Sequence, residues 1–311
     1  MESTSLSVPI LKTLAFFDLF GFPLTAMEVW QYLYSGTRAN VADVQAVLEQ
    51  MPQVKMHQGF YFLVQRPNRI VDERKEKYLI AERKYRRVKR VGKFLARLPF
   101  VRLIGVCNSL SYSNARADSD IDLFVVSAAG RVWTARFFCL LFLKLCGLRP
   151  TDKNRRDKFC LSFFVDLDHL DLRELALPRD DIYLDYWINQ LHPVYDVGGQ
   201  YNRFLAANSW VKAQLANSIG LEPNLRRVIR LGWPSRGVRF VSELLCSGAW
   251  CERLLHWLQL KKMPKALRDK INKDVGVVVR PGVIKLISND RREAYRNEWV
   301  VKGNELVRGR S

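Results

Sequence analysis

The segment that most constrains the fold is an apolar run that begins with acids. Residues 118–126 read Asp-Ser-Asp-Ile-Asp-Leu-Phe-Val-Val. A short apolar run predicts a buried strand, and residues two apart on a strand point to the same face. Asp120 and Asp122 are therefore expected to project together. Because two carboxylates at close range repel each other unless a cation lies between them, the pair predicts a metal site, with Mg²⁺ as the expected ion.

Two further strand-like runs flank this segment. Residues 102–107 and 159–165 have the composition of strands, and an apolar helical pattern over 132–146 precedes the second of them. This alternation predicts an α/β unit. From residue 173 onward the pattern is helical again. Four tryptophans are expected to lie on packed amphipathic helices there: Trp187, Trp210, Trp250 and Trp257.

The first part of the chain predicts three short helices and a hairpin. Residues 10–20 have helical spacing, Thr25 and Glu28 stand in capping-box relation, and Asn40 can cap a third helix. Two strand-like runs around Gln58-Gly59 then indicate a hairpin. Three helices followed by a hairpin resemble a winged helix-turn-helix, which implies contact with DNA or RNA. A protein–protein module of the same build is the alternative.

Residues 69–98 predict one long basic helix. The whole chain carries fifty Lys and Arg against thirty-one Asp and Glu, a formal charge of +19, which indicates a polyanionic partner. On this helix the bases outnumber the acids over several turns, so a phosphate backbone is the expected counterpart and a solvated face the alternative. Its basic positions are Arg74, Lys75, Lys77, Arg83, Lys84, Arg86, Arg87, Lys89, Arg90, Lys93 and Arg97.

A family resemblance follows from the residues before the acids. Asn108-Ser109 comes after the first predicted strand, and ten residues separate Ser109 from Asp120. Together with Asp120 and Asp122, this spacing resembles the nucleotidyltransferase superfamily of the DNA polymerase beta type. The family is marked by a strand, Gly-Ser, a spacer of this kind, and Asp-apolar-Asp-apolar on the next strand. The resemblance covers residues 101–166.

The resemblance implies a nucleotide site. Asn108 and Ser109 would hold the phosphates of a nucleoside triphosphate, and Asp120 and Asp122 would bind the metal. Asn108 replaces the family's Gly, and Asn is among the few residues that enter the left-handed region readily. Lys158 and the other bases before the third strand are candidates to face the phosphates, with a solvated basic loop as the alternative.

The third acid of the family is not at its usual mid-strand place. The predicted third strand has Leu161-Ser162-Phe163 there instead. Asp166 at the strand end is the expected substitute, because an even number of residues separates it from Ser162 and both would point to one face of a regular strand. Asp168 lies behind it.

These observations predict an α/β (α+β) nucleotidyltransferase core with flanking domains. The expected division is a winged-helix-like domain over 1–68, a basic connecting helix over 69–98, the core over 99–172 and a mainly helical domain over 173–311. The expected function is Mg²⁺-dependent transfer of a nucleoside monophosphate onto a hydroxyl acceptor, with RNA as the expected acceptor. The alternatives are a nucleic-acid-binding regulator whose transferase domain only senses nucleotide, and a transferase acting on a small molecule.

The apolar runs and the cysteines of the sequence predict where the protein is located. The longest apolar stretch is too short to span a bilayer, so no membrane span is expected, and a partner protein is possible. Six cysteines show no paired metal-ligand spacing, which predicts buried reduced thiols and a cytoplasmic location.

Overall fold

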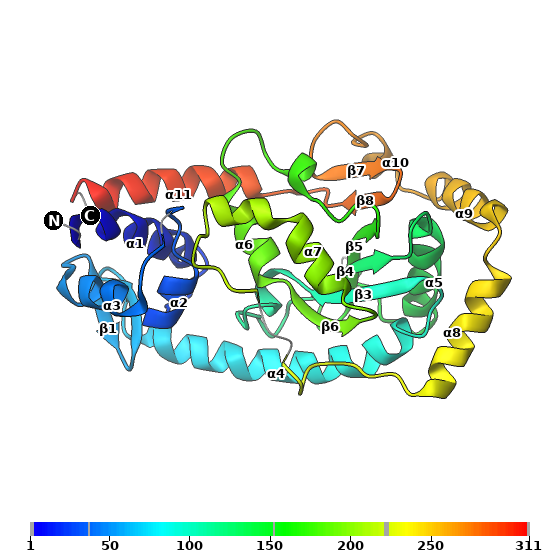
Figure 1. The fold of residues 1–311 in the computed structure, drawn as a ribbon, viewed down its shortest axis with the longest axis horizontal. Coiled ribbons are helices and arrows are strands. Elements are labelled where there is room, and N and C mark those ends of the chain that lie inside the picture. Colours follow the sequence, from blue (N-terminus) through cyan, green and yellow to red (C-terminus); the bar gives the residue numbers. More distant parts are fainter. Residues whose placement is uncertain (1–2, 37, 152, 221–223, 310–311) are drawn as a thin grey trace.

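The structure, a computed structural model, describes residues 3–36, 38–151, 153–220 and 224–309, the side chains of 3–5 excepted. Among these residues the chain forms eleven α-helices, a two-stranded sheet and a mixed six-stranded sheet with the strand order β6-β3-β4-β5-β8-β7. The fold is therefore of the α+β kind, in which helices pack on a mainly antiparallel sheet (Figure 1).

The centre of the large sheet consists of the three strands that the sequence predicts. These are β3 (Val101–Val106), β4 (Ile121–Ser127) and β5 (Phe159–Asp166). β4 and β5 are parallel and are joined by α5 (Val132–Leu145), whereas β3 pairs with β4 in the antiparallel sense. The predicted strand–helix–strand unit is confirmed.

The predicted boundary after residue 172 is wrong, because the later part of the chain completes this sheet. β6 (His192–Asp196) pairs with β3, while β8 (Val283–Leu286) pairs with β5 and β7 (Val277–Arg280) closes the edge. Strands of four or five residues show too little periodicity to be distinguished from helix. The helices of this part are α6 (Ile182–Gln190), α7 (Gln200–Ala207), α8 (Trp233–Leu245), α9 (Ala249–Lys261), α10 (Lys265–Arg268) and α11 (Arg292–Val307).

The two faces of the sheet are covered by different helices. Ile121, Leu123 and Val125 of β4 lie in one apolar cluster with residues of α5 and of α4 (Arg69–Leu95). Phe124 and Val126 lie in another with residues of α6 and α7. Because side chains alternate along a strand, the even-numbered residues of β4 share the α6–α7 face.

The N-terminal part forms the three helices and the hairpin that the sequence predicts. They are α1 (Ser3–Asp18), α2 (Ala26–Gln31), α3 (Val41–Gln50), β1 (Val54–His57) and β2 (Phe60–Leu63). The capping box of Thr25 and Glu28 is present, and both turn residues of the hairpin, Gln58 and Gly59, have positive φ. Asn40 occupies the N-cap position of α3 but makes no side-chain capping hydrogen bond.

This N-terminal part does not have a core of its own. Its apolar cluster includes Tyr186 of α6 and Trp299 of α11. The Tyr186 hydroxyl donates to the Tyr32 carbonyl oxygen at 2.7 Å, and the Trp299 indole donates to the Lys12 carbonyl oxygen at 2.9 Å. Figure 1 shows α1 and α11 side by side. Residues 1–68 are therefore not a separate packing unit, because the end of the chain supplies part of their core.

The basic helix is confirmed as α4, which ends at Leu95 rather than Leu98 and runs beneath the sheet (Figure 1). Several of its basic side chains form contacts within the fold, whereas the sequence predicts that they are available to a phosphate backbone. Arg74 pairs with Glu28, Lys84 is completely buried, and Lys89 donates to the Arg226 carbonyl oxygen. A row of exposed bases still lies along one side of the helix at helical spacing: Arg86, Arg90 and Lys93.

Three further predictions concern a membrane span, the cysteines and the tryptophans. Among the described residues, no helix has both the length and the apolar composition that crossing a bilayer requires. All six cysteines are free thiols. Their predicted burial is confirmed for Cys107, Cys139 and Cys251 but is wrong for Cys146, which is exposed. The expected packing of the tryptophans is confirmed for Trp187, but Trp250 and Trp257 are mostly exposed.

Candidate functional site

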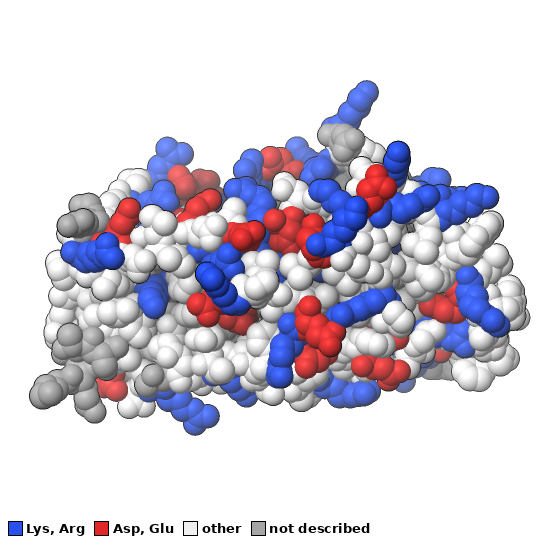
Figure 2. All heavy atoms as spheres, turned by 90° about the horizontal axis from the view of Figure 1, so that it is seen from above, with Lys and Arg blue, Asp and Glu red and all other residues white. Residues whose placement is uncertain are grey.

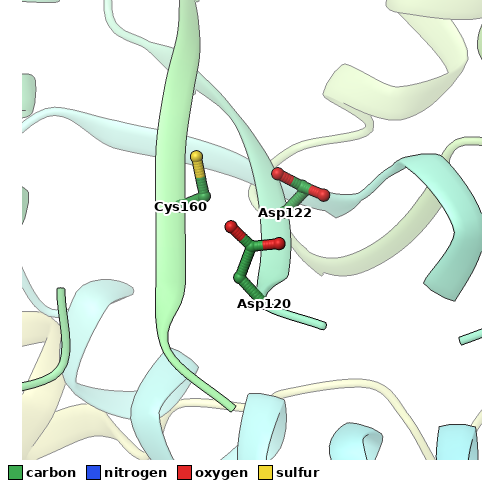
Figure 3. A group of neighbouring side chains, drawn as sticks. All are labelled: Asp120, Asp122 and Cys160. Carbon is green, nitrogen blue, oxygen red and sulfur yellow. The ribbon is translucent and has the colours of Figure 1, made fainter. Parts of the chain in front are cut away.

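Three side chains meet where β4 and β5 begin. The ligand atoms of Asp120, Asp122 and Cys160 all lie within 4.8 Å of one another, and Figure 3 shows the three side chains turned toward the same space. Asp120 directly precedes β4, Asp122 is its second residue, and Cys160 is the residue of β5 paired with Asp122. The predicted convergence of the two acids is confirmed.

Cys160 is the functional candidate that the sequence interpretation missed. The pairing of β4 with β5 shifts between Asp122↔Cys160 and Phe124↔Phe163, so that one extra residue of β5 is accommodated there. The prediction placed Ser162 opposite the acids because it assumed a regular strand. The thiol of Cys160, two residues before Ser162, is itself a possible metal ligand and could have been considered. Whether Cys160 or Ser162 lies opposite the acids is decided by the register between β4 and β5, which are far apart in the sequence.

The assignment of Asp166 to this site is wrong. Asp166 pairs with Ser127 at the other end of the parallel strands, six residues beyond Cys160, or about 20 Å along the strand. Its buried carboxylate accepts hydrogen bonds from the Gly130 amide at 2.9 Å and the Asp168 amide at 3.1 Å, and it contacts the His169 ring at 2.7 Å. Asp166 therefore organises the loops at the far end of the sheet.

The pKa of Asp122 shows the cost of placing the acids together. Burial and, next in size, the charge of Asp120 raise this pKa, whereas hydrogen bonds from Asn108 and Cys160 and the charge of Arg155 lower it. The net effect raises the pKa of Asp122 to about 6. Burial and the charge of Asp122 raise the pKa of Cys160 to about 12. Cys160 is therefore a neutral thiol at physiological pH.

The Asn108 side chain contacts both Asp122 and helix α6. Asn108 opens a short 3-10 turn, Asn108–Leu110, with a φ of 57°, so the predicted left-handed conformation is confirmed. Its side-chain oxygen accepts hydrogen bonds from the Trp187 indole at 3.0 Å and the Tyr183 hydroxyl at 3.4 Å. Ser109 follows in the same turn and is partly exposed. Its role toward phosphate stays a prediction.

Lys158 is not oriented as predicted. Its ammonium donates to the Gly147 carbonyl oxygen at 2.6 Å, at the end of α5, whereas its own carbonyl oxygen accepts from the Ile121 amide at 2.8 Å. Arg155, three residues earlier, is the base of this loop whose charge reaches Asp122. Arg155 is exposed and is therefore the better candidate to meet a phosphate.

Lys84 of α4 contacts the two loops that lead into β4 and β5. Its completely buried ammonium donates to the Ser119 carbonyl oxygen at 2.6 Å and pairs with Asp157 at 2.9 Å. Ser119 precedes Asp120, and Asp157 lies just before β5. Burial raises the pKa of Asp157, but the hydrogen bond and charge of Lys84 outweigh it and hold that pKa below its usual value. Lys84 is therefore a positioning residue, and its predicted contact with nucleic acid is wrong.

A cavity of about 200 Å³ opens beside Asn108. Tyr183 and Tyr295 are stacked at its wall with ring centroids 5.5 Å apart, and Trp187 lines it as well. Its polar wall includes Lys285, whose pKa is lowered to about 8 by burial and by the charge of Arg292. Aromatic rings with a few polar groups are the usual lining of a small-molecule site.

Compared with known proteins, the chain matches no family model, no curated sequence and no solved structure. The function proposed below therefore rests on the geometry of this site.

One consequence of the acid pair is a pH-dependent stability. Since the pKa of Asp122 is about 6 in the folded chain and near 4 in an unfolded one, ionising this group costs stability as the pH rises between those values. Asp122→Asn removes that cost. We expect the metal-free variant to be more stable than the parent by about 3 kcal/mol at pH 7 and above, and the difference to vanish near pH 4.

Thermal unfolding in the presence of a chelator, measured across this pH range, tests the expectation. Asp118→Asn is the matched control, because Asp118 is exposed beside the pair and bonds only to Arg116 among the described residues. A stability difference that does not change with pH would show that Asp122 is not strained by its surroundings.

Proposed function

We propose that this chain is a Mg²⁺-dependent nucleotidyltransferase, which moves a nucleoside monophosphate from a triphosphate onto a hydroxyl acceptor. The convergence of Asp120 and Asp122 at the start of β4, next to the left-handed turn at Asn108, is the observation that carries this proposal. The resemblance to the DNA polymerase beta type supports it, because that family has the same order of turn, spacer and acids.

The donor set fits one Mg²⁺ ion. Carboxylate oxygens are the ligands that Mg²⁺ prefers, and Asp120 and Asp122 supply them, whereas the neutral thiol of Cys160 is a poor ligand for a hard cation. When bound, the ion would supply electrophilic stabilisation of the reacting phosphate oxygens. The raised pKa of Asp122 agrees with this role, because a cation offsets the repulsion between the two acids.

The remaining groups would bind and orient the nucleotide. The Ser109 hydroxyl and the amides of its turn face the triphosphate in this proposal, and Arg155 adds a positive charge. Tyr183 and Trp187 in the neighbouring cavity offer aromatic rings to the base. Asn108 contacts Asp122 and lines this cavity, so it would couple metal and nucleotide binding.

A nucleic-acid acceptor is supported by one exposed row of bases. Arg86, Arg90 and Lys93 on α4 can contact a phosphate backbone without sequence preference. On the face that carries α11 and the β7–β8 edge, Lys and Arg are instead interspersed with Asp and Glu (Figure 2). The winged-helix-like part is less suited to this task, because α3 carries Asp43 and Glu49 but no base.

Cys160 favours a second candidate function. Cys160 is the third member of the cluster, whereas the resemblance implies a third carboxylate that helps to activate the acceptor hydroxyl. A chain that binds nucleotide and metal but transfers slowly would act as a nucleotide-sensing regulator of nucleic acid.

The two functions are distinguished by assaying transfer and binding separately. Labelled nucleoside triphosphates are incubated with the chain, Mg²⁺ and either total RNA or a set of small hydroxyl acceptors. Label that becomes covalently attached to RNA supports the transferase with a nucleic-acid acceptor, and label on a small acceptor supports the small-molecule alternative. Mg²⁺-dependent nucleotide binding without transfer supports the regulator, and no binding at all contradicts both.

Restoring a carboxylate at the third position should raise activity. We expect Cys160→Asp to increase transferase turnover at least about 10-fold in Mg²⁺, because a positioned base contributes roughly 10²-fold or more to proton abstraction. Without metal the added charge should lower the melting temperature, and Mg²⁺ should recover it. Initial rates and thermal unfolding are compared with Cys160→Asn, which has a similar shape but no charge. An equal response of both variants would contradict the role assigned to this position.

A further inference from the structure

Helix α8 is oriented opposite to an ordinary surface helix. A helix on the surface of a globular protein normally turns its apolar side toward the core. In α8 no residue is buried, and the large apolar side chains are turned outward. Trp233 is 82% exposed, Phe240 68% and Leu244 64%. In a helix these three residues lie on one side, and Val241 and Leu245 extend it.

The polar side of α8 holds the helix to the body of the molecule. Glu243 accepts a hydrogen bond from the Phe100 amide at 2.9 Å and pairs with Arg102 of β3 at 2.7 Å. Arg239 hydrogen-bonds to the Tyr195 hydroxyl of β6 and lies 3.7 Å from Glu243. One ion pair and two hydrogen bonds to the sheet side therefore fix the helix with its apolar side facing away from the sheet.

Helix α9 continues this arrangement along the same end of the molecule (Figure 1). Its inner side packs against α5 through Cys251 and Leu255, and Glu252 accepts hydrogen bonds from the first amides of α5. Its outer side carries an apolar stripe at helical spacing. The outer residues of the two helices, called here the α8–α9 apolar face, are Trp233, Phe240, Val241, Leu244, Leu245, Trp250, Leu254 and Trp257.

Charge distinguishes among the surfaces that could cover this face. Both acids of α8 and α9, Glu243 and Glu252, are engaged on the inner side. The exposed charges of the two helices are all basic: Arg236, Arg253 and Lys261. Over residues 224–273 twelve Lys and Arg face three Asp and Glu, so a second copy of this chain would bring like charges together.

We propose that the α8–α9 apolar face binds the surface of an anionic lipid membrane. Trp, Phe and Leu on one side of a helix with Lys and Arg beside them are the composition of a helix that lies in the bilayer interface. Trp in particular places an apolar ring and a polar N–H at the level of the headgroups. Lys261 already lies over the ring of Trp257, 4.9 Å from its centroid, which shows how closely base and aromatic ring alternate here.

Vesicle flotation of the full chain tests this proposal. We expect binding to vesicles of phosphatidylcholine with phosphatidylserine, much weaker binding to phosphatidylcholine alone, and a decrease in high salt, because anionic lipid attracts the bases. The triple variant Trp233→Ser, Phe240→Ser, Leu244→Ser should lose at least about tenfold in vesicle affinity. The tryptophan emission of the parent should shift to shorter wavelength with the anionic vesicles, and that shift should diminish in the variant.

A matched variant controls for surface apolarity in general. Met27→Ser, Leu79→Ser, Val301→Ser removes three other exposed apolar side chains, from α2, α4 and α11, and should bind vesicles like the parent. Failure of the parent to bind anionic vesicles would overturn the proposal. So would equal binding by parent and triple variant, or self-association of the parent that only the triple variant abolishes, which would assign the face to a second copy.

Discussion

Replacing both Asp120 and Asp122 by Asn is expected to abolish Mg²⁺-dependent nucleotide binding and to lower transferase turnover by at least about 10³-fold. A loss of this size corresponds to roughly 4 kcal/mol of transition-state stabilisation. The physical reason is that these two carboxylates are the hard oxygen ligands of the cluster at the start of β4. Without them the cation that offsets the charge of the phosphates has no site.

The measurements are nucleotide binding with and without Mg²⁺, and turnover of labelled nucleotide. Asp118→Asn controls for loss of an acid from the same loop, and it should leave both quantities nearly unchanged because Asp118 is exposed and paired with Arg116. The double variant should fold and be at least as stable as the parent without metal, since the repulsion within the pair is removed. Mg²⁺-dependent binding that persists in the double variant would contradict the assignment of the site.

Lys84→Met is expected to destabilise the fold by about 3 kcal/mol, the lower end of the cost of removing one partner of a buried ion pair, because the Asp157 side chain is 24% exposed. The variant leaves Asp157 without the ammonium at 2.9 Å and the Ser119 carbonyl oxygen without its donor at 2.6 Å. Since Ser119 and Asp157 lead into the two strands of the site, we also expect weaker nucleotide binding in the fraction that remains folded.

Chemical denaturation measures the free energy of unfolding of this variant. Arg86→Met is the matched control, because Arg86 is exposed on the same helix and should change stability by less than about 0.5 kcal/mol. Adding Asp157→Asn to Lys84→Met should recover part of the loss, because it removes a carboxylate that would keep only the more distant Arg83, at 3.5 Å, as its partner. If Lys84→Met were as stable as Arg86→Met, the buried pair would not hold the loops together.

The elements around the site were largely predictable from local sequence. β4, β5 and α5 begin at the predicted residues, and the capping box of Thr25 and the left-handed Asn108 are as expected. These features depend on neighbours within a few positions, such as apolar periodicity, a side-chain cap or the steric tolerance of one residue. The direction of the α8 side chains was not predictable in this way, because an ion pair with β3 and a hydrogen bond to β6 decide it.

The sequence by itself determined that Asp120 and Asp122 project together, since they stand two residues apart at the start of one strand and its two-residue period places them on one face. Only the tertiary structure decided which third residue joins them. Cys160 does so and Asp166 does not, because the register between two strands and its single shift depend on packing across the sheet. The burial of Lys84 was decided in the same way: a lysine on a basic helix is indistinguishable from its exposed neighbours until Asp157, far along the chain, folds against it.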